Sequence, residues 1–175
     1  MKKSLIFLIS LMFVFTACET HEHHNADNDQ EKKEINIEKE KAEISELLDL
    51  LANSTESGNL EMVEKIWCPK DDVTLIGTEN HEKLMGWEEI KKAMQGQFTT
   101  LEETLISITE QNIWLDRDAR TAWFFEELNY NFIYNDKAMS IDGIRFTGVF
   151  VKSDEGEWKL VQGHFSRPTT IDVIN

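Results

Sequence analysis

A short segment near the C-terminus, VQGHFSRP (residues 161–168), places an imidazole, a hydroxyl and a guanidinium close together, on His164, Ser166 and Arg167. An imidazole titrates near neutral pH, so it can bind a ligand, move a proton or orient a partner. Alternation along the run predicts that His164 shares one face with a mixed set of residues: Trp158, Leu160, Gln162 and Ser166. No metal-ligand spacing or nucleophile surrounds His164, so a structural imidazole bonded within a sheet is the alternative.

A second candidate group lies in the run TAWFFEELNYNFIY (residues 121–134). One face of this predicted strand carries aromatic and aliphatic residues around a single acid: Ala122, Phe124, Glu126, Leu128, Tyr130, Phe132 and Tyr134. Desolvation among these rings would disfavour the ionised form of Glu126 and suit it to general acid or base catalysis. The alternatives are that a bulge turns Glu126 to solvent or that it forms a structural ion pair with Arg145.

The run from residue 138 to residue 152 carries two further candidates, Asp142 and Arg145. Arg145 shares a face with Thr147, and Asp142 lies on the opposite face unless a bulge at Gly143 shifts the register. In an aromatic pocket the forked donors of Arg145 would bind a carboxylate or phosphate. An internal salt bridge to Glu126 or Glu127 is the alternative. Asp142 is the second candidate for a proton-transferring carboxylate.

Helices and one short strand come first in the chain. Ile44, Leu47, Leu48 and Leu51 follow the i, i+3, i+4, i+7 spacing of an amphipathic helix, which is expected to end near Asn53. A second short helix carries residues 60–67, and Pro69 stops it. Residues 71–77 read as a short strand, and residues 85–98 as a third helix.

Strands follow the helices. Long β runs are predicted at residues 104–115, 120–134 and 138–152, with a shorter run at 158–166, and hairpin-forming residues connect them. Helices followed by a meander indicate an α+β domain in which an antiparallel sheet curls around the helices.

This order of elements resembles the nuclear-transport-factor-2-like fold and within it the SnoaL-like group, which also contains ketosteroid isomerase and the association domain of calcium/calmodulin-dependent kinase. The resemblance is carried by SGNLEMVEKIW (57–67), GWEEIKKAM (86–94) and RFTGVFVKSDEGEWKLVQGHFS (145–166), and it covers residues 41–167. It implies a cone in which three N-terminal helices pack in a curved antiparallel sheet, a pocket between sheet and helices, and dimers that pair sheet to sheet. The fold hosts enzymes, binding modules and assembly domains alike.

The expected function is binding of a small, mostly apolar molecule with a polar or acidic group. Arg145, His164 and Tyr130 would fix this ligand, while Trp87, Phe124 and Phe132 would enclose it. One alternative is an isomerase, cyclase or dehydratase in which Glu126 or Asp142 moves a proton. The other is an assembly domain whose cone is filled by its own side chains. The sequence contains no Gly-rich phosphate loop, Cys/His metal constellation or nucleophile elbow, so no cofactor is expected.

The N-terminus has the pattern of a secretion signal, with Lys2 and Lys3 before an apolar run too short to span a bilayer. The stretch that ends at Cys18 resembles the lipobox of bacterial lipoproteins, in which the cysteine is lipidated; an ordinary signal peptide is the alternative. We expect a signal peptide at 1–17, a flexible tether at 18–40 and a C-terminal tail at 168–175. Three tether residues are weak metal-ligand candidates: His21, His23 and His24.

Charge and surface pattern indicate the partners. Loss of Lys2 and Lys3 with the signal would change the formal net charge from −15 to −17, which disfavours nucleic acid. Contact with the membrane is expected through the N-terminal lipid alone, in the bacterial envelope, facing the periplasm or exterior. Apolar residues on both faces near Trp123 and Phe125 predict a homodimer. Cys68 is the one cysteine left after Cys18, so no internal disulfide is expected.

Overall fold

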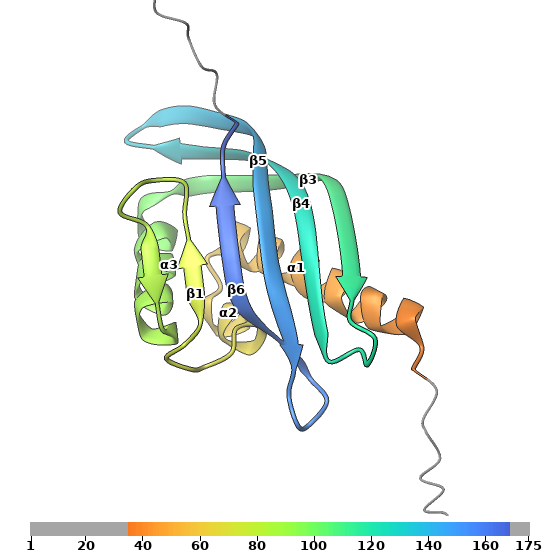
Figure 1. Ribbon diagram of the computed structural model, residues 1–175. Coiled ribbons are helices and arrows are strands. Elements are labelled where there is room, and N and C mark those ends of the chain that lie inside the picture. Colours follow the sequence, from red (N-terminus) through yellow and green to blue (C-terminus); the bar gives the residue numbers. More distant parts are fainter. Residues whose placement is uncertain (1–34, 169–175) are drawn as a thin grey trace, which may run out of the picture. The chain divides into compact units, whose positions relative to one another are not determined.

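The computed structural model describes residues 35–168, which form three helices and six strands (Figure 1). In chain order they are α1 (Ile37–Ser57), α2 (Leu60–Ile66), β1 (Thr74–Ile76), β2 (Lys83–Met85), α3 (Trp87–Thr100), β3 (Glu102–Leu115), β4 (Thr121–Tyr134), β5 (Lys137–Lys152) and β6 (Trp158–Ser166). The predictions for the signal peptide, Cys18, His21, His23, His24 and most of the tether and tail fall outside the described residues.

The strands form one sheet in the order β2-β1-β6-β5-β4-β3. The meander from β3 to β6 is antiparallel throughout, as predicted. β1 pairs with β6 in the parallel sense, however, and β2 then pairs antiparallel with β1. The expectation of a wholly antiparallel sheet is therefore wrong at this edge, because the chain between α2 and α3 runs beside the last strand in the same direction.

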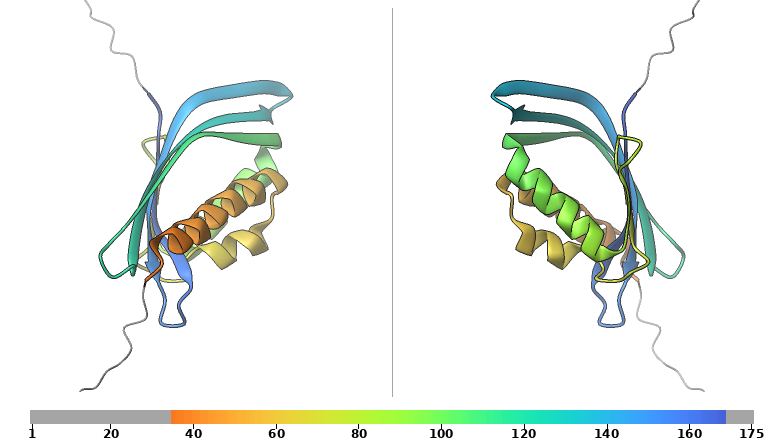
Figure 2. Two further views of the ribbon diagram at one scale, coloured as in Figure 1. Left: turned by 90° about the vertical axis from the view of Figure 1, so that its right-hand side faces the viewer. Right: turned by 90° about the vertical axis from the view of Figure 1, so that its left-hand side faces the viewer.

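The sheet curves around the helices, which lie on its concave face (Figure 2). α1 runs four residues beyond the predicted end at Asn53. Within this extension the hydroxyls of Ser54 and Thr55 donate to the carbonyls of Leu50 and Leu51, which satisfies both hydroxyls inside the helix. The helix ends where Gly58 adopts the left-handed conformation with φ of 64°.

Glu40, near the start of α1, connects this helix to the end of β5 and the start of β6. Its carboxylate forms an ion pair with Lys152 and accepts a hydrogen bond from Trp158 Nε1 over 2.8 Å. Asn36 caps the helix by accepting from the backbone N–H of Lys39. Residues 37–40, which we expected in the tether, therefore belong to the folded domain.

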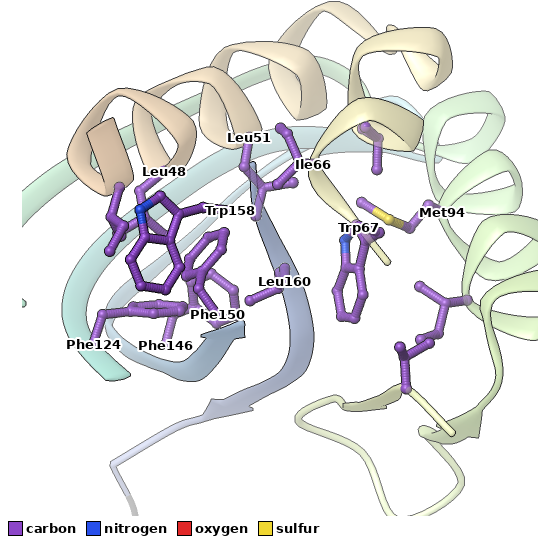
Figure 3. Packing of buried hydrophobic residues seen from close by; sticks show 14 of the residues in the cluster. Leu48, Leu51, Ile66, Trp67, Met94, Phe124, Phe146, Phe150, Trp158 and Leu160 are labelled. Atoms are coloured by element: carbon purple, nitrogen blue, oxygen red, sulfur yellow. The ribbon is translucent and has the colours of Figure 1, made fainter. Parts of the chain in front are cut away.

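The centre of the cone is packed with aromatic side chains (Figure 3). Phe124 contacts Phe146 edge to face, with ring centroids 4.9 Å apart, and lies 5.6 Å from Phe150. Trp158 and Leu48 are also buried here, between the sheet and α1. Each such side chain contributes roughly 1.5–3 kcal/mol by leaving water. Side chains of the domain itself therefore occupy much of the space between sheet and helices.

No helix within residues 35–168 has both the length and the apolar character needed to cross a membrane.

Candidate functional site

Glu126 lies on the concave face of β4, as predicted. Its neighbours on that face, Phe124 and Leu128, are buried, and Glu126 itself is only 3% exposed. The pKa of its carboxyl is raised to about 7, mainly by burial and to a smaller extent by the charge of Asp49, while a hydrogen bond from Gln111 opposes both. A carboxyl that titrates near neutral pH suits proton transfer.

One neutral side chain, Gln111, connects Glu126 to α1 through two hydrogen bonds. Gln111 Nε2 on β3 donates to Glu126 Oε1 over 2.8 Å, and Gln111 Oε1 accepts from the Ser45 hydroxyl over 2.7 Å. None of the ion pairs between residues 35 and 168 includes Glu126. The alternative of an internal salt bridge from Glu126 to Arg145 is therefore wrong.

Tyr130 lines an opening of about 100 Å³ at the wide end of the cone. The opening lies between the C-terminal ends of α1 and α3 and the strands β3 and β4, and its lining also includes Glu56, Gln97, Phe98 and Leu101. Gln97 Nε2 donates to the Tyr130 hydroxyl over 2.7 Å. No described residue accepts the hydroxyl hydrogen of Tyr130, so this hydrogen is free to meet a ligand.

Tyr130 stays protonated over the whole physiological range. Burial raises its pKa to about 12, and the negative charge of Glu56 adds to the shift against the hydrogen bond from Gln97. Phe132 packs edge to face on Tyr130, with ring centroids 5.7 Å apart. The opening therefore presents a neutral hydrogen-bond donor, the Tyr130 hydroxyl, and Gln97 and Phe132 hold this side chain in place.

Arg145 lies on the convex face of the sheet and not in a pocket. Its chain neighbours Ile144 and Phe146 are buried on the concave side, so alternation turns Arg145 outward, where it is exposed. It stands beside Glu127 of β4 and Ser166 of β6. The predicted role of Arg145 as an anion clamp inside the cone is wrong, although its shared face with Thr147 is confirmed.

His164 also lies on the convex face, because β6 contains a bulge at Val161. Leu160 pairs with Phe150, but Gln162 pairs with Val149, so one residue of β6 is left over and the alternation reverses. The predicted row that joins His164 to Trp158 and Leu160 is therefore wrong. His164 instead pairs with Thr147 of β5 and with Ile76 of β1.

The remaining predicted residues do not gather at one place. Asp142 is exposed at the bulge around Gly143, where Asn129 accepts the Gly143 backbone N–H, so it does not join Glu126 in a pocket. Trp87 is buried against Trp67, with ring centroids 6.3 Å apart. Phe124 belongs to the core. Of the six predicted ligand contacts, the opening is lined by Tyr130 alone, with Phe132 packed behind it.

Sequence reasoning missed Gln97, Gln111 and Ser45, which carry no charge and match no motif. One signal for Gln111 was present, because it alternates with Ile113 and Leu115 and so shares their inward face. Between residues 35 and 168, no three His, Cys, Asp or Glu side chains are placed to hold a metal ion. Cys68 is a free, half-buried thiol.

Comparison with known proteins identifies the fold. The family profile described as SnoaL-like domain matches residues 44–170. A nuclear transport factor 2 (NTF2-like) superfamily protein from Salmonella enterica superimposes with a TM-score of 0.70 and 16% identity, over 78% of this chain and 96% of that one. A protein named only as a candidate dehydratase of the NTF2-like family from Streptomyces avermitilis gives a TM-score of 0.67 and 17% identity, over 76% and 99%.

A third similar structure carries a name of a different functional class. It is a candidate calcium/calmodulin-dependent protein kinase II association domain from Xanthomonas campestris, with a TM-score of 0.62 and 22% identity, over 74% of this chain and 88% of that one. No curated protein matches the chain. At these identities the likeness shows the fold, and the site must be argued from the residues of this chain.

Proposed function

Because the chain belongs to the SnoaL-like domain family, whose members share a cone-shaped α+β fold, we propose that it binds a small organic molecule through the opening at Tyr130. The observation that carries this proposal is the neutral phenol of Tyr130, whose oxygen accepts from Gln97 and whose hydrogen is left for a ligand. A carbonyl or hydroxyl oxygen on the ligand would accept that hydrogen.

The opening favours a neutral polar group over an acidic one. Glu56 lines it and brings a carboxylate there, whose Oε1 accepts the backbone N–H of Ile106 over 2.6 Å. Arg145 and His164, which were expected to receive an acidic group, face the opposite side of the sheet. A volume of about 100 Å³ admits one end of a ligand, whose apolar body would rest on Phe98 and Leu101.

A test with simple probes follows from this geometry. Cyclohexanone, cyclohexanol and cyclohexanecarboxylate would be titrated into the mature protein and followed by ligand-observed NMR. The two neutral probes should bind, the carboxylate should bind at least tenfold more weakly because of Glu56, and Tyr130→Phe should weaken the binding of both neutral probes. Tyr134→Phe is the matched control because Tyr134 is exposed at the tip of the β4–β5 hairpin. Equal binding of all three probes to wild type and Tyr130→Phe would contradict the proposal.

The wider setting is that of a lipid-anchored protein of the bacterial envelope. The lipobox-like stretch at Cys18 and the short apolar run before it support this placement. α1 has 21 residues, so it separates the opening from the start of the domain by about 30 Å.

A second copy of the chain is the proposed partner of the convex face. Trp114 and Trp123 are directly opposed across β3 and β4 on this face and are 44% and 45% exposed. Val149 is the next residue of this row on β5. Exposed tryptophans side by side on a sheet are typical of surfaces that are covered in an assembly.

Acid–base catalysis is the alternative function, and one observation favours it, the pKa of Glu126 near 7. Glu126 stands four residues before Tyr130 on the same face of β4, a separation of about 13 Å along the strand. A substrate that reached both would have to enter past the buried side chain of Leu128. Trapping of a substrate-like molecule against Glu126 in a crystal structure would support catalysis over simple binding.

A further inference from the structure

Within the described residues, the buried carboxyl of Glu126 has no cationic partner. A neutral side chain binds it instead and connects it to a surface groove. Buried acids are normally paired with a cation, because the low-dielectric interior otherwise penalises their charge. The partner of Glu126 is the amide of Gln111. Gln111 also lines a groove of about 410 Å³ between α1 and β3, together with Glu38, Lys41, Ala42, Ser45 and Ile113.

We propose that this groove is a second ligand site, separate from the opening at Tyr130, which takes a primary ammonium group and responds to the protonation of Glu126 through Gln111 and Ser45. Two hydrogen bonds with defined directions connect Glu126 to the groove. Gln111 donates from Nε2 to Glu126 and accepts through Oε1 from the Ser45 hydroxyl.

An ionised Glu126 fixes these directions. A carboxylate only accepts hydrogen bonds, so the amide must turn its NH₂ group inward and its oxygen toward Ser45. The Ser45 hydrogen is then used by Gln111, and the hydroxyl offers only its lone pairs to the groove. Lone pairs at the floor of a groove receive a donor such as an ammonium group.

A protonated Glu126 permits the reverse arrangement. Its O–H can donate to a flipped amide oxygen, and Gln111 Nε2 then donates to Ser45. The Ser45 hydrogen is released toward the groove and one of the lone pairs of the hydroxyl is taken by Gln111, so the groove binds an ammonium group more weakly. The hydrogen-bonding character of the groove therefore follows the charge of an acid that does not itself line it.

The charges around this chain of contacts also favour a cation. From α1, Asp49 lies one turn beyond Ser45, and Glu38 forms an ion pair with Lys41 over 3.7 Å. β3 contributes the neutral Gln111 beside Glu126, and β5 contributes the apolar Phe146. On the strand of Glu126 itself, Glu127 points to the convex face. Glu38 and Lys41, which line the groove, offset each other, so with Glu126 ionised the net charge around the Gln111–Ser45 contacts is negative.

Thermodynamic linkage relates the affinity for an ammonium group to the pKa of Glu126. An ammonium group that prefers the ionised form must lower the pKa of Glu126 from about 7, and its own affinity must rise with pH by the same factor. A downward shift of one unit corresponds to a tenfold gain in affinity between acid and alkaline conditions.

The test uses n-butylammonium as the probe, with 1-butanol as the uncharged control, on the mature protein at pH 5.5 and pH 8.5. We expect n-butylammonium to bind at least tenfold more tightly at pH 8.5 and to lower the pKa of Glu126 measured from its carboxyl ¹³C shift. 1-Butanol should show no dependence on pH. Ser45→Ala should weaken n-butylammonium binding at least tenfold without moving the midpoint of urea unfolding greatly, since Ser45 is half-buried.

Two variants separate this site from its surroundings. Glu126→Gln keeps the shape of the side chain and should bind n-butylammonium equally at both pH values. Tyr130→Phe should behave as wild type here, so failure of the opening at Tyr130 and failure of the groove are distinguishable. Equal affinity of wild type at both pH values, an unchanged pH dependence in Glu126→Gln, or no effect of Ser45→Ala would each overturn the proposal.

Discussion

Gln97 and Tyr130 meet over 2.7 Å, with the amide of α3 donating to the phenol of β4. Because the phenol oxygen accepts this bond, its hydrogen is not used by Gln97 and remains available to a ligand in the opening that Tyr130 lines. This contact fixes the hydrogen-bonding direction of the Tyr130 hydroxyl in the opening. It also joins the end of a helix to the sheet at the place where a ligand would enter.

Stability should fall as pH rises from about 4.5 to about 7 because of Glu126. The folded-state pKa of about 7 lies above the ordinary value of 4.5, so the folded protein holds a proton that the unfolded chain has lost, and this contribution is lost as pH rises. The full effect is on the order of 3 kcal/mol. Glu126→Gln should remove this slope and unfold at higher urea concentration than wild type at pH 8. If the free energy of unfolding in urea depended on pH equally in wild type and Glu126→Gln, the raised pKa of Glu126 would be contradicted.

Glu40→Ala should destabilise the domain by about 1–3 kcal/mol, because it leaves the ammonium of Lys152 and the indole N–H of Trp158 without their acceptor. Glu43→Ala is the matched control on the same helix. The ion pair of Glu43 with Lys39 is exposed, so its loss should change the free energy of unfolding by less than about 0.5 kcal/mol. Guanidinium unfolding of both variants checks the difference, and equal effects would show that Glu40 does not fasten α1 to the sheet.

Trp123→Glu should convert the proposed dimer to a monomer, because it places a charge on the convex face beside the exposed Trp114. Tyr134→Glu is the control, since Tyr134 is 43% exposed, nearly as much as Trp123, but lies at the hairpin tip. Sedimentation velocity should show a dimer for wild type and Tyr134→Glu and a monomer for Trp123→Glu. A wild-type protein that is monomeric at micromolar concentration would contradict the proposed dimer.

Lipidation at Cys18 is tested by mass. The wild-type protein recovered from membranes should lack residues 1–17 and carry acyl chains, whereas Cys18→Ser should not acquire them. Intact-mass spectrometry of both proteins decides this. A wild-type mass that corresponds to an unmodified cysteine would favour an ordinary signal peptide.

Alternation along β4 predicted the concave face of that strand correctly. The period of two is unbroken from Ala122 to Leu128, so the place of Glu126 among buried neighbours could be inferred from sequence. The same reasoning failed on β6. One extra residue at Val161 reverses every side chain that follows, and no glycine or turn residue at that position signals the bulge.

The contacts that build the candidate sites could not be inferred in this way. Gln97 and Tyr130 are separated by 33 residues and Ser45 and Gln111 by 66, and the pairing depends on where a helix crosses a curved sheet. Arg145 illustrates a second feature that could not be predicted from the sequence. Its face was assigned together with Thr147 correctly, but which face of β5 turns to the helices is decided by the packing of Ile144, Phe146 and Phe150.

Native mass spectrometry of the mature protein purified from its own host tests the binding proposal most directly. The account predicts a small neutral molecule bound to the wild-type chain and to Tyr134→Phe, in a ratio of one per protomer, and its loss from Tyr130→Phe. A bound molecule retained in full by Tyr130→Phe, or a wild-type chain that carries no small molecule at all, would contradict it.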